Sequence, residues 1–233
     1  GYLEHSGSAR RERRKLKSPM LSTKDVQALC QGRHVDPFGV LGAHTLADGS
    51  RWLSTFLPGA AQVHAVSRDG GAAMGPLQLR DAAGLFEGPL NGPGPYRLQV
   101  RWADGQSALL DDPYAFGQVL GEMDAWLLGE GSHLRPFEIL GATPRVMDGV
   151  AGCGFAVWAP NAEQVSVVGD FNRWDGTRHP LRSRQSSGIW EGFITGIGKG
   201  AQYKYRIKTK YFGYVVDKAD PLAIYSQVSP GTA

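Results

Sequence analysis

The amino-acid sequence predicts an all-β protein made of two tandem β-sandwiches. Glycine and proline account for 46 of the 233 residues, so turns are frequent and long helices cannot dominate. Short apolar runs, several of them alternating with polar residues, are separated by Gly, Pro, Asn and Asp. The second half of the chain also repeats the order of motifs in the first half. At roughly 150 residues per domain, the length fits one large domain or two smaller ones.

The chain begins with a basic segment, residues 1–19, which is expected to be a solvated, disordered arm. This segment has a local charge of +4 within a net charge of +3, so the remaining 214 residues sum to −1. The body of the protein is therefore not basic, and nucleic-acid binding is disfavoured, although a basic arm alone could touch phosphates. The bases are Arg10, Arg11, Arg13, Arg14, Lys15 and Lys17, against Glu4 and Glu12.

A short helix is expected after the arm. The segment STKD at 22–25 resembles a capping box, with Asp in place of Glu at the third helical position. Val26, Leu29 and Cys30 then fall on one helical face, and Gly32 supplies a stop.

Two segments near the start of each half carry the clearest repeat. HVDPFGVLGA (34–43) and HLRPFEILGA (133–142) share six of ten residues at a constant offset of 99. Chance could supply any one match, but not a whole series in one order, so a module of about 100 residues is duplicated in tandem. The further pairs are FLPGAAQV (56–63) and WAPNAEQV (158–165), LFEG (85–88) and IWEG (189–192), PYRLQV (95–100) and QYKYRI (202–207), and DPYAF (112–116) and DPLAI (220–224).

Each copy contains four runs that are typical of β-strands. In YKYRIKT (203–209), Lys204, Arg206 and Lys208 alternate with aromatic and apolar residues, so the three bases share one face. Short strands at spacings of 8–12 residues are typical of immunoglobulin-like β-sandwiches. The other runs are RWLSTFL (51–57), QVHAVS (62–67), LFEG (85–88) and YRLQVRW (96–102) in the first copy, and GFAVWA (154–159), QVSVVGD (164–170) and IWEGFI (189–194) in the second.

An apolar helical stripe between the copies predicts a short helical linker. Because an apolar face needs cover, this helix is expected to pack against the sandwiches. The stripe comprises Val119, Leu120, Met123, Trp126 and Leu127. The expected organisation is therefore a disordered basic arm (1–19), an N-terminal β-sandwich (20–117), a helical linker (118–132) and a second β-sandwich (133–233).

The two cysteines, Cys30 and Cys153, belong to no CxxC or Cys/His pattern and cannot form a disulfide framework. They are interpreted as buried, reduced thiols of a cytoplasmic protein. No run of 18 apolar residues exists, and no apolar stretch follows the basic arm, so neither a membrane span nor a secretory signal is predicted.

The sequence contains no constellation typical of an active site. The motifs G-x-S-x-G, GxxxxGK[ST], HExxH and GxGxxG are all missing. The two histidines that recur in the repeat, His34 and His133, are interpreted as hydrogen-bonded elements of the fold. Asp111 and Asp112 are adjacent in a strand-to-turn stretch, so their side chains should diverge, whereas two acid/base carboxylates flank one scissile bond. No catalytic residue, metal site or cofactor is expected.

The segment GDFNRWD (169–175) is the sharpest functional signal. Trp174 follows the end of a strand, in a polar turn where a large aromatic side chain is costly to expose. One interpretation is a lid folded over the core; the other is a platform for the C–H face of a sugar ring. Burial of roughly 100 Å² of apolar surface contributes on the order of 2 kcal/mol per stacked ring. A site of this kind binds sugar with a dissociation constant in the millimolar to high-micromolar range. It is useful because a polymer presents many sugar units, which raises the effective concentration.

Longer stretches of the sequence carry a family resemblance. GFAVWAPNAEQVSVVGDFNRWDGTRHPL (154–181), followed by GIWEGFI, QYKYRI and KADPLA, resembles a family 48 carbohydrate-binding module. DPYAFGQVLGEMDAWLLGEGSHLRPFEILGATP (112–144) resembles bacterial 1,4-α-glucan (glycogen) branching enzymes. The first copy resembles the extra N-terminal module of the longer members of that family. The resemblance covers about residues 21–233.

The resemblance implies a set of glucan-binding residues. They correspond to Trp174 and Asn172 in the FNxW turn, Lys204 in the QYK strand, and an aromatic in the following hairpin, which is one of Tyr211, Phe212 or Tyr214. RDGGAAM (68–74) occupies the place of this turn in the first copy, so that copy is not expected to bind sugar by the same route.

The resemblance also implies what this chain does not contain. Enzymes of the family cleave an α-1,4 bond and rejoin it as α-1,6 on a (β/α)₈ barrel, which needs at least about 200 residues. Two sandwiches already use the chain, so it is expected to be inactive alone, to bind or position α-glucan (glycogen, maltooligosaccharides) for the barrel, and to influence transferred chain length. The alternatives are a structural buttress of the barrel without sugar affinity and a stand-alone glycan-sensing scaffold. The exposure of the Trp174 ring separates the first two.

Overall fold

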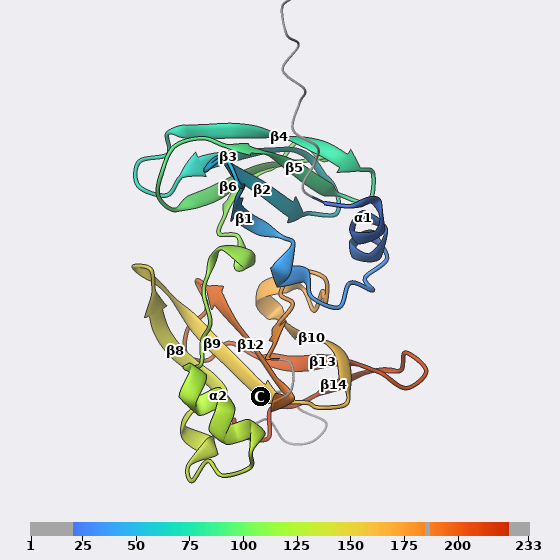
Figure 1. The fold of residues 1–233 in the computed structure, drawn as a ribbon, viewed down its shortest axis with the longest axis vertical. Helices are drawn as coiled ribbons and strands as arrows, with labels where there is room; N and C mark the ends of the chain where they lie inside the picture. The colour runs from blue at the N-terminus through green and yellow to red at the C-terminus, as the bar shows by residue number, and fades with distance from the viewer. Residues whose placement is uncertain (1–20, 185–186, 224–233) are drawn as a thin grey trace, which may run out of the picture.

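In the computed structural model, residues 21–184 and 187–223 are described, and they form two β modules stacked one above the other (Figure 1). The segment 1–19, expected to be a disordered arm, lies outside the described residues. The front module contains α1 (Thr23–Cys30), η1 (Pro37–Gly39), β1 (Gly42–Thr45), β2 (Arg51–Phe56), β3 (Ala60–Ser67), β4 (Ala73–Asp81), β5 (Leu85–Leu90), β6 (Tyr96–Trp102), β7 (Ser107–Leu110) and η2 (Pro113–Ala115). The second module follows with α2 (Glu122–Gly129), η3 (Pro136–Glu138), β8 (Gly141–Met147), β9 (Val150–Trp158), β10 (Ala162–Gly169), η4 (Asp170–Asn172), β11 (Arg182–Ser183), β12 (Ile189–Thr195), β13 (Tyr203–Thr209) and β14 (Val215–Lys218).

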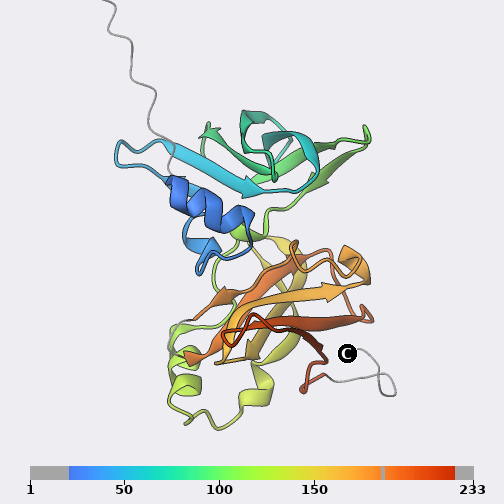
Figure 2. The same ribbon diagram turned by 90° about the vertical axis from the view of Figure 1, so that its right-hand side faces the viewer.

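Helix α1 forms where the sequence predicts it. Ser22 is the N-cap, and its hydroxyl oxygen accepts a hydrogen bond from the Asp25 N–H at 3.1 Å. Val26 and Leu29 are buried against the front module, and Gly32 ends the segment with φ of 62°. Figures 1 and 2 show α1 and the loop after it on the side of the front module that faces the second.

The strands of the front module form one continuous seven-stranded sheet in the order β1-β2-β5-β4-β3-β6-β7. The sheet is continuous because β4 pairs with β3 through its first half and with β5 through its second half. The two layers of the sandwich are thus joined by a strand that passes from one to the other.

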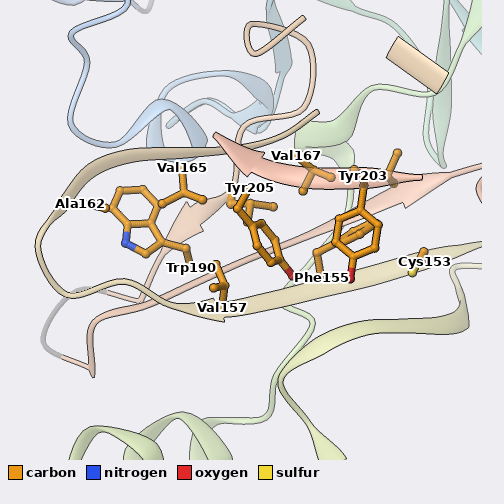
Figure 3. Packing of buried hydrophobic residues seen from close by; sticks show 11 residues of the cluster. Cys153, Phe155, Val157, Ala162, Val165, Val167, Trp190, Tyr203 and Tyr205 are labelled. Atoms are coloured by element: carbon orange, nitrogen blue, oxygen red, sulfur yellow. The ribbon is translucent and has the colours of Figure 1, made fainter. Parts of the chain in front are cut away.

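The second module keeps its two layers separate, as β10-β13-β14 and β11-β12-β9-β8. The segment that corresponds to β4 is reduced to a single bridge between Pro180 and Ser166 and to the two-residue strand β11. Figure 3 shows the core between the layers, where Tyr203 and Tyr205 of β13 point toward Phe155 and Val157 of β9. The period-two alternation of β13 is therefore confirmed: its aromatic side chains are buried and its bases lie on the outer face.

The histidines of the repeat have the structural role predicted for them. His34 Nε2 lies 3.2 Å from Asp25 Oδ1, and His133 Nε2 lies 3.4 Å from Asp124 Oδ1. In both copies Nδ1 accepts a backbone N–H two residues on, at 3.1 Å. Each histidine therefore ties the helix of its module to the segment that leads into the first strand. Helix α2 precedes β8 as α1 precedes β1, and the two helices are 99 residues apart in the sequence, which is the offset of the repeat.

The glycine of the repeated LGA motif recurs for a steric reason. Gly42 and Gly141 have φ of 89° and 92°, where side chains are strained. A Cβ atom on Gly42 would also lie 2.9 Å from the carbonyl oxygen of Tyr114. The same position on Gly141 would lie 3.3 Å from Asp220 Oδ2. Each glycine thus allows the end of its module to close over the first strand.

Two expectations for buried apolar residues require correction. In the stripe 119–127, Val119 and Leu120 are buried but precede α2, and Leu127 is half-buried. Met123 and Trp126 are 67% and 60% exposed, because the helix contacts the module through Ala125 and Leu128 instead. Both cysteines are free, but only Cys153 is buried; Cys30, at the end of α1, is partly exposed. No helix in the described part of the chain is long and apolar enough to cross a membrane.

Candidate functional site

The turn between β10 and β11, residues 170–180, is built around the buried amide of Asn172. Its Oδ1 accepts the N–H of Gly169 at 2.9 Å, which fixes Nδ2 as the donor atom. Nδ2 donates to the carbonyl oxygen of Val167 and to Nδ1 of His179, both at 2.8 Å. Asn172 is 1% exposed, so it holds the turn from inside and does not face solvent.

The histidine in this network is a neutral acceptor. Because Nδ1 of His179 accepts from Asn172, the ring proton resides on Nε2. Burial of the ring, together with the nearby charge of Arg178, lowers the pKa of His179 to about 4. The turn is therefore assembled around an uncharged imidazole at neutral pH.

Trp174 projects from a strained part of this turn. Arg173 and Trp174 have φ of 56° and 59°, in the left-handed region that residues other than glycine seldom occupy. The indole Nε1 donates to Asp170 Oδ1 at 3.0 Å. The side chain is partly exposed and belongs to none of the core clusters in the described part of the molecule. Trp174 is thus neither part of the buried core nor fully exposed to solvent.

The outer face of the sheet β10-β13-β14 holds the turn in place through Arg206. Arg206 Nη1 donates to the carbonyl oxygen of Trp174 at 3.0 Å. Its Nε and Nη2 donate to the two carboxylate oxygens of Asp217 on β14, each at 2.7 Å. A Cβ atom on Gly176 would lie 2.8 Å from Arg206 Cδ. The glycine therefore allows the backbone of the turn to pass close to the arginine side chain. The bidentate pair fixes the arginine and, through it, the backbone of Trp174.

Lys204 lies on the same face of the sheet as Arg206, two residues earlier on β13. It pairs in register with Val168, near the end of β10 from which the turn departs. The structure therefore brings Trp174 and Lys204 to one end of one sheet face.

The aromatic residues of the hairpin lie elsewhere. Tyr211 and Tyr214 are each 66% exposed, and Phe212 is fully exposed at φ of 57°. The hairpin follows Thr209, which pairs with Ala162 at the opposite end of β10 from Val168 (Figure 1). Tyr211, Tyr214 and Phe212 therefore extend beyond the far end of the sheet from Trp174.

Arg206 and Asp217 are the site residues that sequence reasoning missed. The alternation in YKYRIKT places Arg206 beside Lys204, which is a usable signal. Asp217 has no such signal, because its position opposite Arg206 depends on the length of the hairpin between β13 and β14.

The adjacent carboxylates Asp111 and Asp112 contact different partners. Asp112 accepts hydrogen bonds from the Tyr96 hydroxyl at 2.7 Å and the Tyr114 N–H at 3.1 Å, whereas Asp111 pairs with Arg97 at 3.1 Å. The two side chains diverge, as predicted. Among residues 21–184 and 187–223, no group of three or more His, Cys, Asp or Glu side chains could hold a metal ion.

A second surface feature lies around α2 and η3 of the second module. Apolar side chains around α2 and η3 are exposed there, where Figures 1 and 2 show these elements at the bottom of the molecule. This apolar surface consists of Met123 (67% exposed), Trp126 (60%), Leu134 (93%) and Phe137 (60%). Exposed apolar side chains of this size are candidates for a contact surface.

Comparisons with known proteins identify relatives of both modules. Residues 22–114 match the family model of the alpha-1,4-glucan branching enzyme GlgB N-terminal domain, and residues 139–223 match carbohydrate-binding module 48 (isoamylase N-terminal domain). The 1,4-alpha-glucan branching enzyme GlgB of Pseudomonas fluorescens (strain Pf0-1) is 47% identical over 224 residues, which are 96% of this chain and 30% of that protein. The enzyme of the same name from Rubrobacter xylanophilus is 50% identical over 208 residues, or 89% of this chain and 28% of that protein.

The chain thus spans less than a third of the length of these relatives. Among solved structures, PulA from Klebsiella oxytoca is 17% identical and covers 82% of this chain and 20% of its own, with a TM-score of 0.33, a likeness too low to carry weight. The family resemblance of the sequence is confirmed for both modules. The front module belongs to the N-terminal domain family of α-1,4-glucan branching enzymes, the second is a family 48 carbohydrate-binding module, and together they correspond to the non-catalytic N-terminal region of a bacterial branching enzyme.

Proposed function

We propose that this chain binds α-glucan on the outer face of β10-β13-β14, with Trp174 as the stacking platform. In a longer protein that transfers α-1,4 chains to form α-1,6 branches, the chain positions glycogen or maltooligosaccharide near a catalytic barrel and influences the length transferred. The observation that carries this proposal is the partly exposed Trp174, held in a left-handed conformation by Arg206 and Asn172. Backbone strain is retained where the surrounding contacts require it, often at ligand sites.

Each neighbouring residue has a distinct part in the proposal. Lys204 supplies an ammonium donor for hydroxyl groups at the rim of the sugar, on the same face as the platform. Asn172 is buried, so it acts by holding the turn and not by touching sugar. Tyr211 and Tyr214, at the hairpin tip, provide an accessory contact that only a long glucan chain would reach. The free thiols of Cys30 and Cys153 are compatible with the cytoplasm, where glycogen is made.

The test is a titration with maltoheptaose followed by tryptophan fluorescence. The wild-type chain is expected to saturate near the millimolar range, because one or two stacked rings contribute only a few kcal/mol. Trp174→Ala should remove the part of the signal change that comes from this indole, and Lys204→Ala should weaken binding severalfold. The matched control is Trp158→Ala, which removes an indole that is 61% exposed at the end of β9, on the other sheet. A flat titration of the folded wild-type chain would refute the proposal.

The apolar surface around α2 favours a second candidate function, that of a buttress for the catalytic barrel. Met123, Trp126, Leu134 and Phe137 are the kind of side chains that a large partner surface covers. If so, the chain alone should enhance the fluorescence of an apolar dye such as ANS, and Trp126→Ser should reduce the enhancement without lowering thermal stability. Dye binding that is unchanged in Trp126→Ser would contradict this function. A stand-alone glycan sensor has no observation of this kind in its favour.

A further inference from the structure

We infer that the cleft between the two modules is a second binding site, for a neutral oligosaccharide. The inference rests on the proposed function in taking α-glucan as the ligand, but it concerns a different surface from the Trp174 face. The cleft has a volume of about 580 Å³ and is lined by both modules. This volume lies within the range of roughly 300–1,000 Å³ that is usual for small-molecule sites.

The walls of the cleft combine an aromatic ring with polar groups from both sides. Trp102, the last residue of β6, and Arg97 belong to the front module, and Phe171 and Arg178 belong to the turn of the second module. The Arg178 guanidinium lies over the Trp102 ring, with Cζ 5.5 Å from the ring centre. The Trp102 ring is half-buried between this guanidinium and the core of the front module, so the cleft offers a ligand the remaining apolar surface of the indole and fixed guanidinium donors.

The charged side chains that line the cleft are paired with one another, so the cleft favours an uncharged ligand. Arg97 pairs with Asp111 at 3.1 Å, and Arg178 pairs with Asp175 at 3.5 Å. His179, which also lines the cleft, is neutral because burial lowers the pKa of its imidazole to about 4. A phosphate or nucleotide would find no net positive charge here. A polyhydroxylated neutral ligand matches the lining, since each hydroxyl both donates to a carboxylate and accepts from a guanidinium.

Charged side chains on both walls are partly exposed and so can be reached. The side chain of Arg97 is 31% exposed on the front wall, and those of Asp175 and Arg178 are 42% and 49% exposed on the other. Asp175 and Arg178 belong to the same turn as Trp174, so the cleft and the Trp174 face lie on two sides of one turn.

The test uses the whole chain labelled with 5-fluorotryptophan and follows the ¹⁹F signals during titration with maltoheptaose. The Trp102 and Trp174 signals are assigned from Trp102→Phe and Trp174→Ala. In Trp174→Ala, the Trp102 signal is expected to keep its saturable shift, because the cleft is an independent site. Loss of the Trp102 shift in this variant would show that Trp102 only senses the other site, and would overturn the inference.

A plug in the cleft separates direct binding from an indirect effect. Ala151, which is exposed and lines the cleft, is replaced in Ala151→Phe, with Ala151→Ser as the matched control. The Phe variant is expected to abolish the Trp102 shift and keep the Trp174 shift at unchanged thermal stability, whereas the Ser variant keeps both. A Trp102 shift that survives the plug overturns the inference and leaves the Trp174 site intact. If neither signal moves in the wild-type chain, the proposed function itself fails.

Discussion

Arg206 and Asp217 form a bidentate ion pair, with both N···O distances 2.7 Å, across strands β13 and β14. The hydrogen bonds from the Arg206 guanidinium lower the pKa of the Asp217 carboxyl below its ordinary value. The third guanidinium nitrogen, Nη1, binds the Trp174 carbonyl oxygen at 3.0 Å. The pair therefore links the sheet to the turn that displays the tryptophan.

Arg206→Gln is expected to weaken maltoheptaose binding about threefold to tenfold with little change in stability. One charge-assisted hydrogen bond contributes about 1 kcal/mol or more, and its loss frees the Trp174 backbone. The measurement is the dissociation constant by tryptophan fluorescence. The matched control is Lys208→Ala, which removes the next base on the same face, paired with Glu163 at 3.5 Å. Equal losses of affinity in the two variants would indicate a general charge effect and contradict the role assigned to Arg206.

Asn172→Ala should destabilise the second module by about 2–3 kcal/mol. The substitution removes three buried hydrogen bonds and leaves the N–H of Gly169 and the carbonyl of Val167 without their partner. The measurement is the free energy of unfolding from urea denaturation. Asn161→Ala is the control, because that side chain is exposed and the change should cost less than about 0.5 kcal/mol.

The protonation of His179 predicts how stability depends on pH. In the unfolded chain the imidazole titrates near its ordinary value of 6.5, whereas burial lowers the pKa in the folded state to about 4. Between these values the unfolded state binds a proton that the folded state does not, so stability falls as the pH drops, by up to about 1.4 kcal/mol per pH unit. Above pH 6.5 this contribution is constant.

The check compares urea denaturation of the wild-type chain and His179→Gln between pH 7 and 4. The variant retains an amide that can accept from Asn172, and the difference in unfolding free energy between the two proteins should shrink as the pH falls. Taking the difference removes the opposite effect of Asp112, whose pKa burial raises to about 6. A constant difference across this range would show that His179 does not titrate as inferred.

The repeat and the strands were predictable because they are local in sequence. Motifs such as HLRPFEILGA and the alternation in YKYRIKT reflect contacts within one segment or a fixed period along a strand. The duplication of the helix leaves one trace in the sequence, because Asp25 and Asp124 are 99 residues apart, as are His34 and His133. The two helices share too few other residues for the sequence alone to show that they are copies.

Other features depend on contacts that sequence spacing does not encode. The path of β4 between layers, the pairing of Asp217 with Arg206 and the contact of Arg178 with Trp102 are set by how distant segments meet. Burial of Asn172 was missed for the same reason: its polar character suggests a surface residue, yet its amide replaces backbone partners inside the turn.

A last prediction concerns the buried tyrosine–aspartate pair that both modules contain. Tyr96 donates to Asp112 at 2.7 Å, and Tyr203 donates to Asp220 at 2.5 Å, from equivalent strands. Asp220 also accepts from the hydroxyl of Tyr205 at 3.3 Å, whereas Tyr96 is the one side-chain donor recorded for Asp112 in the described part of the chain. Loss of the Tyr96 hydroxyl therefore leaves Asp112 without a side-chain donor, whereas loss of the Tyr203 hydroxyl leaves Asp220 with the hydroxyl of Tyr205.

Tyr96→Phe is expected to cost about 2–3 kcal/mol of unfolding free energy, and Tyr203→Phe about 1 kcal/mol less, because an unsatisfied buried carboxylate carries its full desolvation penalty. Tyr96→Phe should also raise the pKa of Asp112 further above about 6, since the lost hydrogen bond favours the ionised form. The loss of stability should therefore be larger at pH 8 than at pH 5, where the carboxyl is protonated in the folded state. Equal costs for the two tyrosines, or a Tyr96→Phe cost independent of pH, would mean that water replaces the missing hydroxyl.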